Sequence, residues 1–224
     1  MATEREAAVD DYIVERLIGE DEAVAAALAA NVAAGLPPIE VSIAQGRMLQ
    51  LYARMIGARR ILEVGTLGGV STIFLARALP EGGRLISCEI NPKHAEVARG
   101  NVANAGLADK VDIRVGPAID TLGAMLTTQE AAFDLVFIDA DKQSNPDYVR
   151  AALHLAHPGT IIIVDNVIRQ GGVIEEASSD PMILGTRALF DLVHAEKKLT
   201  ATAIQTVGLK NWDGFMLALV GAFR

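Results

Sequence analysis

Cysteine is nearly absent from the chain: Cys88 is the only one among 224 residues. A single cysteine cannot form an internal disulfide, so a disulfide-rich secreted fold is excluded and a reducing compartment is favoured. Long apolar runs are missing too, since no stretch approaches the roughly 18 uninterrupted apolar residues of a membrane-spanning helix. The first residues, MATEREAAVDD, are acidic and unlike a signal peptide. We therefore expect a cytoplasmic protein with no membrane partner.

Basic residues are in the minority. Lys and Arg number 20 against 28 Asp and Glu, which leaves a net charge of −8. Because phosphate binding needs a basic face, this balance disfavours a nucleic-acid partner. The four histidines are expected on exposed helix surfaces, and no Cys or His pair suggests zinc; they are His94, His154, His157 and His194.

The hydrophobic fraction of 51% is that of a globular protein, and the length fits one ordinary domain. No repeat or linker divides the chain. We expect a single domain over residues 1–224, with a helical appendage (1–58) before an alternating core (59–224). In the appendage, apolar spacing predicts two short helices broken near residues 19–21, and a third helix that Ser42 caps.

The most informative stretch is Ile61–Ser71, ILEVGTLGGVS. It predicts a buried strand that ends at Gly65, a glycine-rich turn, and a helix from Val70. Glycines in such a turn permit positive φ and allow a ligand to approach the main chain. Glu89 ends the next predicted strand, where its carboxylate can accept hydrogen bonds from ribose hydroxyls. The spacing G-x-x-G-G is not the dinucleotide pattern G-x-G-x-x-G, which argues against a dehydrogenase.

From Arg60 onward, apolar strands alternate with helical patterns, which indicates a mostly parallel α/β sheet covered on both faces. Two final strands joined by a short turn predict an antiparallel pair at one edge. The predicted strands are 61–65, 84–89, 111–115, 133–139, 160–165, 199–207 and 213–220, and the predicted helices of the core are 70–79, 92–105, 118–126 and 146–156.

Two neighbouring strands end in oxygen-bearing side chains. Asp139 ends the strand FDLVFID, and Asp165 and Asn166 end the strand IIIVDN. In an open parallel sheet, ligands lie outside the carboxyl ends of the strands. Two carboxylates and an amide oxygen suit a hard divalent cation such as Mg²⁺, Mn²⁺ or Ca²⁺. The sequence therefore predicts a metal site beside the glycine turn.

From about Ile39 to Val220 the chain resembles the cation-dependent class I O-methyltransferases of the catechol and caffeoyl-CoA type. The motifs that carry the resemblance are LEVGTLGGVS, CEINP, VGPA, DLVFIDADK, IIIVDNV and WDG. The resemblance implies a Rossmann-like, seven-stranded sheet of order 3-2-1-4-5-7-6 with strand 7 antiparallel. It also implies S-adenosylmethionine as the cofactor and a small aromatic substrate with vicinal hydroxyls.

The residue roles implied by this resemblance fall into three sets. Asp139, Asp165 and Asn166 match the metal ligands, and Lys142 matches the general base. The cofactor set matches the methionine, ribose and adenine ends of the ligand; it comprises Val41, Glu63, Gly65, Thr66, Gly69, Ser71, Glu89, Pro117, Ala118 and Asp139.

One departure concerns the substrate. Mammalian catechol enzymes carry an acidic residue shortly before the DG of the last motif, and residues 207–212 here contain none. Trp212 is a candidate wall for a planar substrate, or an ordinary packing residue, and the loop 169–181 is expected to rim the substrate opening. Two alternatives stay open: a metal-independent methyltransferase, and a non-catalytic S-adenosylmethionine-binding protein. We also expect the N-terminal helices to close the cofactor site and contribute to a homodimer.

Overall fold

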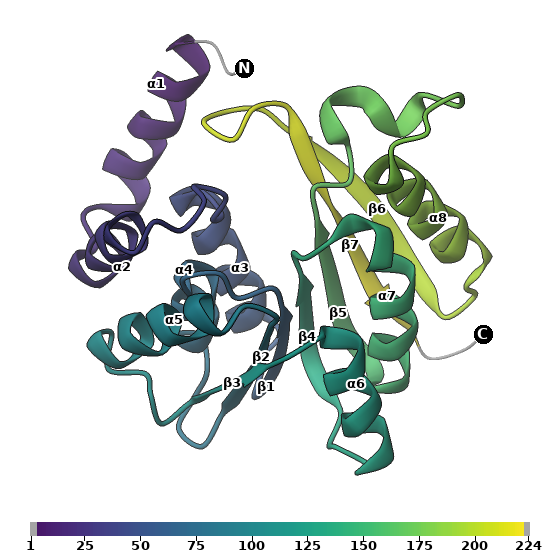
Figure 1. Ribbon diagram of the computed structural model, residues 1–224, viewed down its shortest axis with the longest axis horizontal. Coiled ribbons are helices and arrows are strands. Elements are labelled where there is room, and N and C mark those ends of the chain that lie inside the picture. Colours follow the sequence, from purple (N-terminus) through teal and green to yellow (C-terminus); the bar gives the residue numbers. More distant parts are fainter. Residues whose placement is uncertain (1–3, 222–224) are drawn as a thin grey trace.

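In the computed structural model, which describes residues 4–221, a seven-stranded sheet runs through the centre of the molecule (Figure 1). Its strand order is β3-β2-β1-β4-β5-β7-β6. Strands β1 to β5 pair in parallel, and β7 pairs antiparallel with both β5 and β6. The expected order and the antiparallel strand 7 are confirmed. The strands are β1 (Arg60–Val64), β2 (Arg84–Glu89), β3 (Val111–Val115), β4 (Phe133–Ile138), β5 (Ala156–Asp165), β6 (Leu199–Thr206) and β7 (Asp213–Val220).

Helices cover both faces of the sheet, as expected. One apolar cluster includes Leu62, Val136 and Leu189 and joins the sheet to α6, α7 and α8. The other includes Leu49 and Phe74 and joins the opposite face to α2, α3, α4 and α5. These helices are α2 (Glu22–Ala33), α3 (Ile43–Met55), α4 (Val70–Ala76), α5 (Pro92–Asn104), α6 (Ala118–Thr127), α7 (Asn145–His154) and α8 (Pro181–Ala195).

The N-terminal helices divide into two parts. α2 and α3 contribute Val24, Ala27 and Leu49 to the core, and Ser42 caps α3 through a capping box with Gln45. By contrast, α1 (Glu4–Ile13) and the π-helical turn η1 (Val14–Ile18) bury no residue. Figure 1 shows α1 projecting from the body of the molecule, towards the β6–β7 hairpin.

Three details differ from the sequence expectation. The helix α8 was not predicted, although Asp180 caps it and Pro181 begins it in the same way that Asn91 and Pro92 begin α5. Strand β5 starts at Ala156, before the expected residue 160. His157 therefore lies on a strand, half-buried beside Asp134, and the expectation of an exposed helical histidine is wrong there.

Candidate active site

The glycine turn lies at the carboxyl ends of β1 and β4. Gly65 has φ of +99°, and a Cβ at this position would overlap the main chain of Asp139. The amide of Asp139 in turn donates to the carbonyl of Val64 at 2.8 Å. Gly69, with φ of +82°, is the N-cap of α4 and packs closely on Ala98. Only glycine allows this close approach of the turn to the end of β4.

Glu89 shapes the same turn from the end of β2. Its Oε2 accepts hydrogen bonds from the amides of Thr66 at 3.1 Å and Leu67 at 2.8 Å. Its Oε1 accepts from the amide of Asn91 and lies 3.4 Å from Nδ1 of His94. Glu89 is thus adjacent to the glycine turn, as its predicted ribose-binding role requires.

The turn that follows β3 lies on the other side of Glu89. The amide of Gly116 donates to the carbonyl of Glu89, and Pro117 and Ala118 then begin α6. Pro117 and Ala118, which belong to the predicted cofactor set, are therefore close to Glu89, the residue predicted to bind the ribose.

Glu63 lies entirely inside the protein, beneath the glycine turn. Its carboxylate accepts hydrogen bonds from the hydroxyls of Ser71, Thr72 and Ser87, each at 2.6 Å. Burial raises the pKa of Glu63 from 4.5 to about 7, against the opposing effect of the three hydroxyls. The hydroxyl of Ser71, a member of the predicted cofactor set, donates to Glu63 in this structure.

The two acidic strand ends meet, as expected. Ile138 of β4 pairs with Val164 of β5, which places Asp139 beside Asp165. Burial and the neighbouring Asp139 raise the pKa of Asp165 well above its usual value. Asn166 follows with φ of +61°, and its backbone N–H donates to Oδ1 of Asp165 at 2.8 Å.

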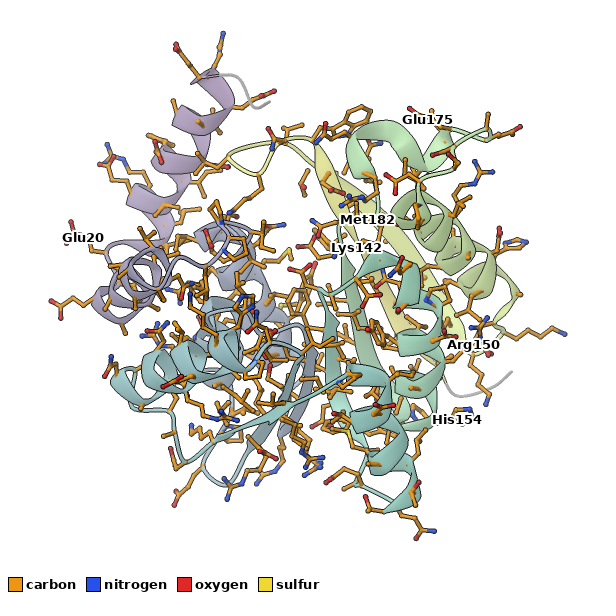
Figure 2. The ribbon with its side chains drawn as sticks, in the orientation of Figure 1. Glu20, Lys142, Arg150, His154, Glu175 and Met182 are labelled. Carbon is orange, nitrogen blue, oxygen red and sulfur yellow. The ribbon has the colours of Figure 1, made fainter. Side chains whose placement is uncertain are left out.

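Lys142 joins this pair from the 3₁₀ turn η2 (Lys142–Ser144). Its Nζ donates to Oδ1 of Asp139 at 2.7 Å, and only 5% of the residue is exposed. A lysine without a catalytic role would ordinarily be solvated at the surface. Lys142 is instead buried and in contact with a carboxylate. Figure 2 labels Lys142 near the start of α7.

The residues present fit a hard divalent cation by their chemistry. Between residues 4 and 221 no cluster of three or more His, Cys, Asp or Glu side chains could hold a metal ion. The predicted set does not need such a cluster, because its third ligand is the amide oxygen of Asn166. Two carboxylates side by side, of which Asp165 is buried, repel each other, and a positive charge between them would lower that cost.

Trp212 and Asp213 contact the segment that follows Asn166. The Trp212 indole is 44% exposed, donates to the Gln205 side chain at 2.9 Å and packs against Gly171 of the turn η3 (Arg169–Ile174). Asp213 accepts from the amides of Ile168 and Arg169, both at 3.0 Å. Sequence reasoning assigned Asp213 no role, although the WDG motif had drawn attention to it.

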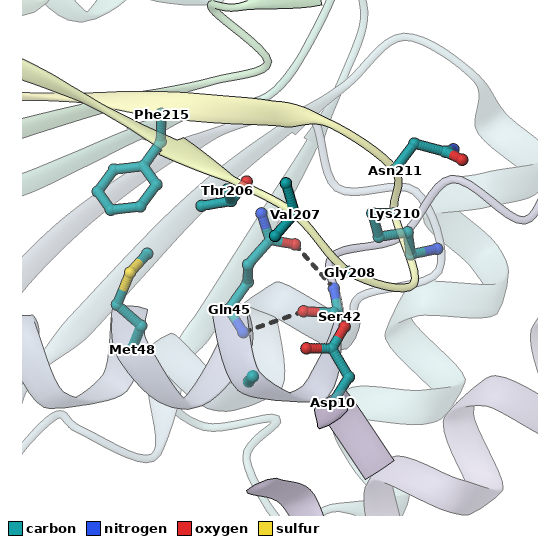
Figure 3. Close-up of a pocket in the computed structure, with 11 residues that line it drawn as sticks. Asp10, Ser42, Gln45, Met48, Thr206, Val207, Gly208, Lys210, Asn211 and Phe215 are labelled. Atoms are coloured by element: carbon teal, nitrogen blue, oxygen red, sulfur yellow. Dashed lines mark hydrogen bonds between the residues drawn. The ribbon is translucent and has the colours of Figure 1, made fainter. Parts of the chain in front are cut away.

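Two cavities lie beside β7, near the segment that contains Trp212 and Asp213. The larger, of about 210 Å³, lies between α1, α3 and the β6–β7 hairpin, and Figure 3 shows Gln45, Met48 and Phe215 on its wall. It contains none of the predicted site residues. The smaller, of about 10 Å³, shares those three residues and adds Val41 and Asp165. Val41, a member of the predicted cofactor set, is therefore close to Asp165 at the end of β5.

A sheet of order 3-2-1-4-5-7-6 with β7 antiparallel, a glycine turn after β1 and an acidic residue at the end of β2 is typical of the class I methyltransferases. A sequence profile of the O-methyltransferase family matches residues 18–219. The chain therefore belongs to the O-methyltransferase family, whose members are S-adenosylmethionine-dependent enzymes.

Three relatives support this assignment. The catechol O-methyltransferase of Mycobacterium tuberculosis is 53% identical over 95% of this chain and 94% of its own length. The crystal structure of an O-methyltransferase from Bacillus cereus with S-adenosylhomocysteine has a TM-score of 0.96 and 49% identity, over 97% of this chain and 99% of that one. An O-methyltransferase of Streptomyces achromogenes involved in tomaymycin synthesis, in complex with S-adenosylmethionine, has a TM-score of 0.95 and 44% identity, over 99% of this chain and 100% of that one.

Proposed function

We propose that this enzyme methylates a hydroxyl of a small, catechol-like aromatic substrate. We also propose that the reaction requires a divalent cation, with Mg²⁺ as the first candidate. One observation carries the proposal: Asp139, Lys142, Asp165 and Asn166 gather at the ends of β4 and β5, directly beside the glycine turn. A protein that only bound the cofactor would have no need of this group.

Three oxygen-bearing side chains would hold the cation: Asp139, Asp165 and the amide of Asn166. The bound cation would act as a Lewis acid that makes the acceptor hydroxyl more acidic. Two carboxylates offset the charge of a divalent ion, so the site can still accept an anionic substrate oxygen.

The chain's own residues would then do two things. Lys142, whose Nζ lies 2.7 Å from Oδ1 of Asp139 and so beside the proposed cation site, would take the proton of the acceptor hydroxyl on a neutral Nζ. The charge of a divalent cation held there would disfavour the ammonium form that pairs with Asp139. The glycine turn, Glu89 and the Glu63–Ser71 pair would hold S-adenosylmethionine so that its activated methyl group faces that oxygen.

The substrate class is supported by the printed name of the Mycobacterium tuberculosis relative, a catechol O-methyltransferase, and by the half-exposed indole of Trp212 near Asn166. Residues 207–212 carry no acid that could hold a second hydroxyl. We therefore expect the substrate's second hydroxyl to be held mainly by the cation.

The decisive experiment measures methyl transfer to a panel of catechols with Mg²⁺ and after exhaustive chelation. Asp165→Ala should abolish metal-dependent transfer and leave S-adenosylmethionine binding intact by calorimetry. Asp147→Ala is the matched control, because Asp147 is exposed and pairs only locally with Arg150. Lys142→Ala should lower turnover by about 10²–10⁴-fold. Full activity without metal would favour the metal-independent alternative, and no transfer to any acceptor would favour a binding protein.

We also propose a homodimer in which the N-terminal helices take part. The support is that α1 buries no residue within this chain while Tyr12 is exposed on it. The division into an appendage (1–58) and a core (59–224) stays a proposal, as does the cytoplasmic location expected from the single cysteine. No helix between residues 4 and 221 is both long and apolar enough to cross a membrane.

A further inference from the structure

The helix α8 packs directly on the turn that carries Lys142. Its contact point is Gly185, which is buried. A Cβ added to Gly185 would come within 3.0 Å of the carbonyl oxygen of Lys142 and of the Cα and N atoms of Gln143. All three are main-chain atoms, so the overlap could not be relieved by rotating a flexible side chain.

The helix itself has little freedom to withdraw. Four residues after Gly185, Leu189 is fully buried in the cluster that joins α8 to the sheet. Close-packed interiors resist such displacements. A methyl group at position 185 would therefore push the shorter element, the three-residue turn η2.

A hydrogen bond also holds the residue that precedes this turn. The hydroxyl of Tyr148, on α7, donates to Oδ1 of Asp141 at 2.6 Å. The other oxygen of Asp141 accepts from the amide of Ser144 at 3.2 Å. Lys142 thus lies in a turn fixed between Gly185 and the Asp141–Tyr148 hydrogen bond, which leaves its side chain directed at Asp139.

We propose that Gly185 and Tyr148 are positioning residues for Lys142. Gly185 has no side chain and so lets α8 approach the turn η2, and the Tyr148 hydroxyl holds Asp141 at the start of that turn. Together they fix the position of the turn and so that of the Lys142 amine. This inference rests on the proposed role of Lys142 as the base. In this proposal, neither Gly185 nor Tyr148 touches the substrate or the cofactor.

The test compares Gly185→Ala and Tyr148→Phe, each alone and combined with Lys142→Ala. Gly185→Ala should lower kcat by about 10–100-fold, because misplacing a reacting group by an ångström is costly. Tyr148→Phe should have a smaller effect in the same direction, and it removes only a hydroxyl, so it remains informative if Gly185→Ala does not fold. The Kd for S-adenosylmethionine should not change in either.

The combined variants separate positioning from general damage. In the Lys142→Ala background, each second change should alter kcat by less than about twofold, because residues that act through one group are not additive. Gly123→Ala is the matched control: Gly123 is an exposed helical glycine on α6 with no atom within 4 Å of an added Cβ. Leu189→Val loosens α8 without placing an atom against η2, and should lower Tm and leave kcat intact.

Equal losses with and without Lys142 would overturn the inference. So would a crystal structure of Gly185→Ala in which the distance from Lys142 Nζ to Asp139 Oδ1 is still 2.7 Å. That structural measurement does not depend on the reaction. By contrast, wild-type turnover in Lys142→Ala alone would refute the proposed base, and the structure would then decide separately whether Gly185 places the turn.

Discussion

The buried carboxyl of Glu63 makes the stability of the fold depend on pH in a way that one substitution should remove. The pKa of Glu63 rises from 4.5 in the unfolded chain to about 7 in the folded protein, mainly through burial. Between these values the folded state holds a proton that the unfolded state has lost. The free energy of unfolding therefore falls as pH rises from about 4.5 to about 7, and stays lower above that.

The magnitude follows from the shift. Each pKa unit corresponds to about 1.4 kcal/mol, so the full cost of ionising Glu63 is about 3 kcal/mol. Glu63→Gln cannot ionise and escapes this cost, although its amide fits the hydroxyls of Ser71, Thr72 and Ser87 less well, at a cost of about 1 kcal/mol at every pH. We expect Glu63→Gln to be less stable than the wild type at pH 4.5 and more stable at pH 8.5.

Urea unfolding followed by circular dichroism, at both pH values and on both proteins, measures this crossover. The comparison between variant and wild type cancels the other titrating groups. Ser87→Ala removes one hydroxyl donor and should steepen the wild-type pH dependence. A stability difference between Glu63→Gln and wild type that is the same at pH 4.5 and 8.5 would refute the reasoning.

Three further predictions concern other parts of the molecule. Glu89→Ala should weaken S-adenosylmethionine binding by about 1–3 kcal/mol in calorimetry, since a charged hydrogen bond is lost; unchanged affinity would contradict its assignment. Deletion of residues 1–35 should lower the mass in solution from dimer to monomer, and a truncated protein with the same oligomeric state as the full chain would count against a role of the N-terminal helices in the dimer. The pKa of His157 is raised by hydrogen bonds to Pro158 and Asp134. His157→Ala should therefore destabilise the fold most below pH 6.5 in thermal unfolding, with a smaller effect as pH rises; a pH-independent loss would exclude the charged pair.

Much of the fold could be predicted because its signals are local. Apolar strands followed by polar or glycine residues predict a parallel sheet with polar groups at one edge; these residues are Gly65, Glu89, Asp139 and Asp165. The alternation of strands and helices predicts helices on both faces of that sheet. The capping residue Ser42 predicted the start of α3. The strand order came through the resemblance to a family, because alternation alone does not say that β7 lies between β5 and β6.

The parts that could not be predicted depend on partners far apart in the chain. α8 has an Asp-Pro start like that of α5, but its burial follows from contact with the Lys142 turn, which no local pattern encodes. His157 was misplaced because the extra residues at the start of β5 become strand only by pairing beside Phe133.

The sequence by itself therefore determined which residue types stand at the strand ends, and with them the class of chemistry, because strand periodicity and glycine turns are properties of neighbouring residues. Only the tertiary structure decided how those residues are used. Glu63 shares its carboxylate with hydroxyls from α4 and β2, Lys142 reaches Asp139 from a turn that Gly185 limits, and Asp213 on β7 holds the amides that follow Asn166. The physical reason is that burial, close approach and electrostatic repulsion exist only between segments that folding brings together.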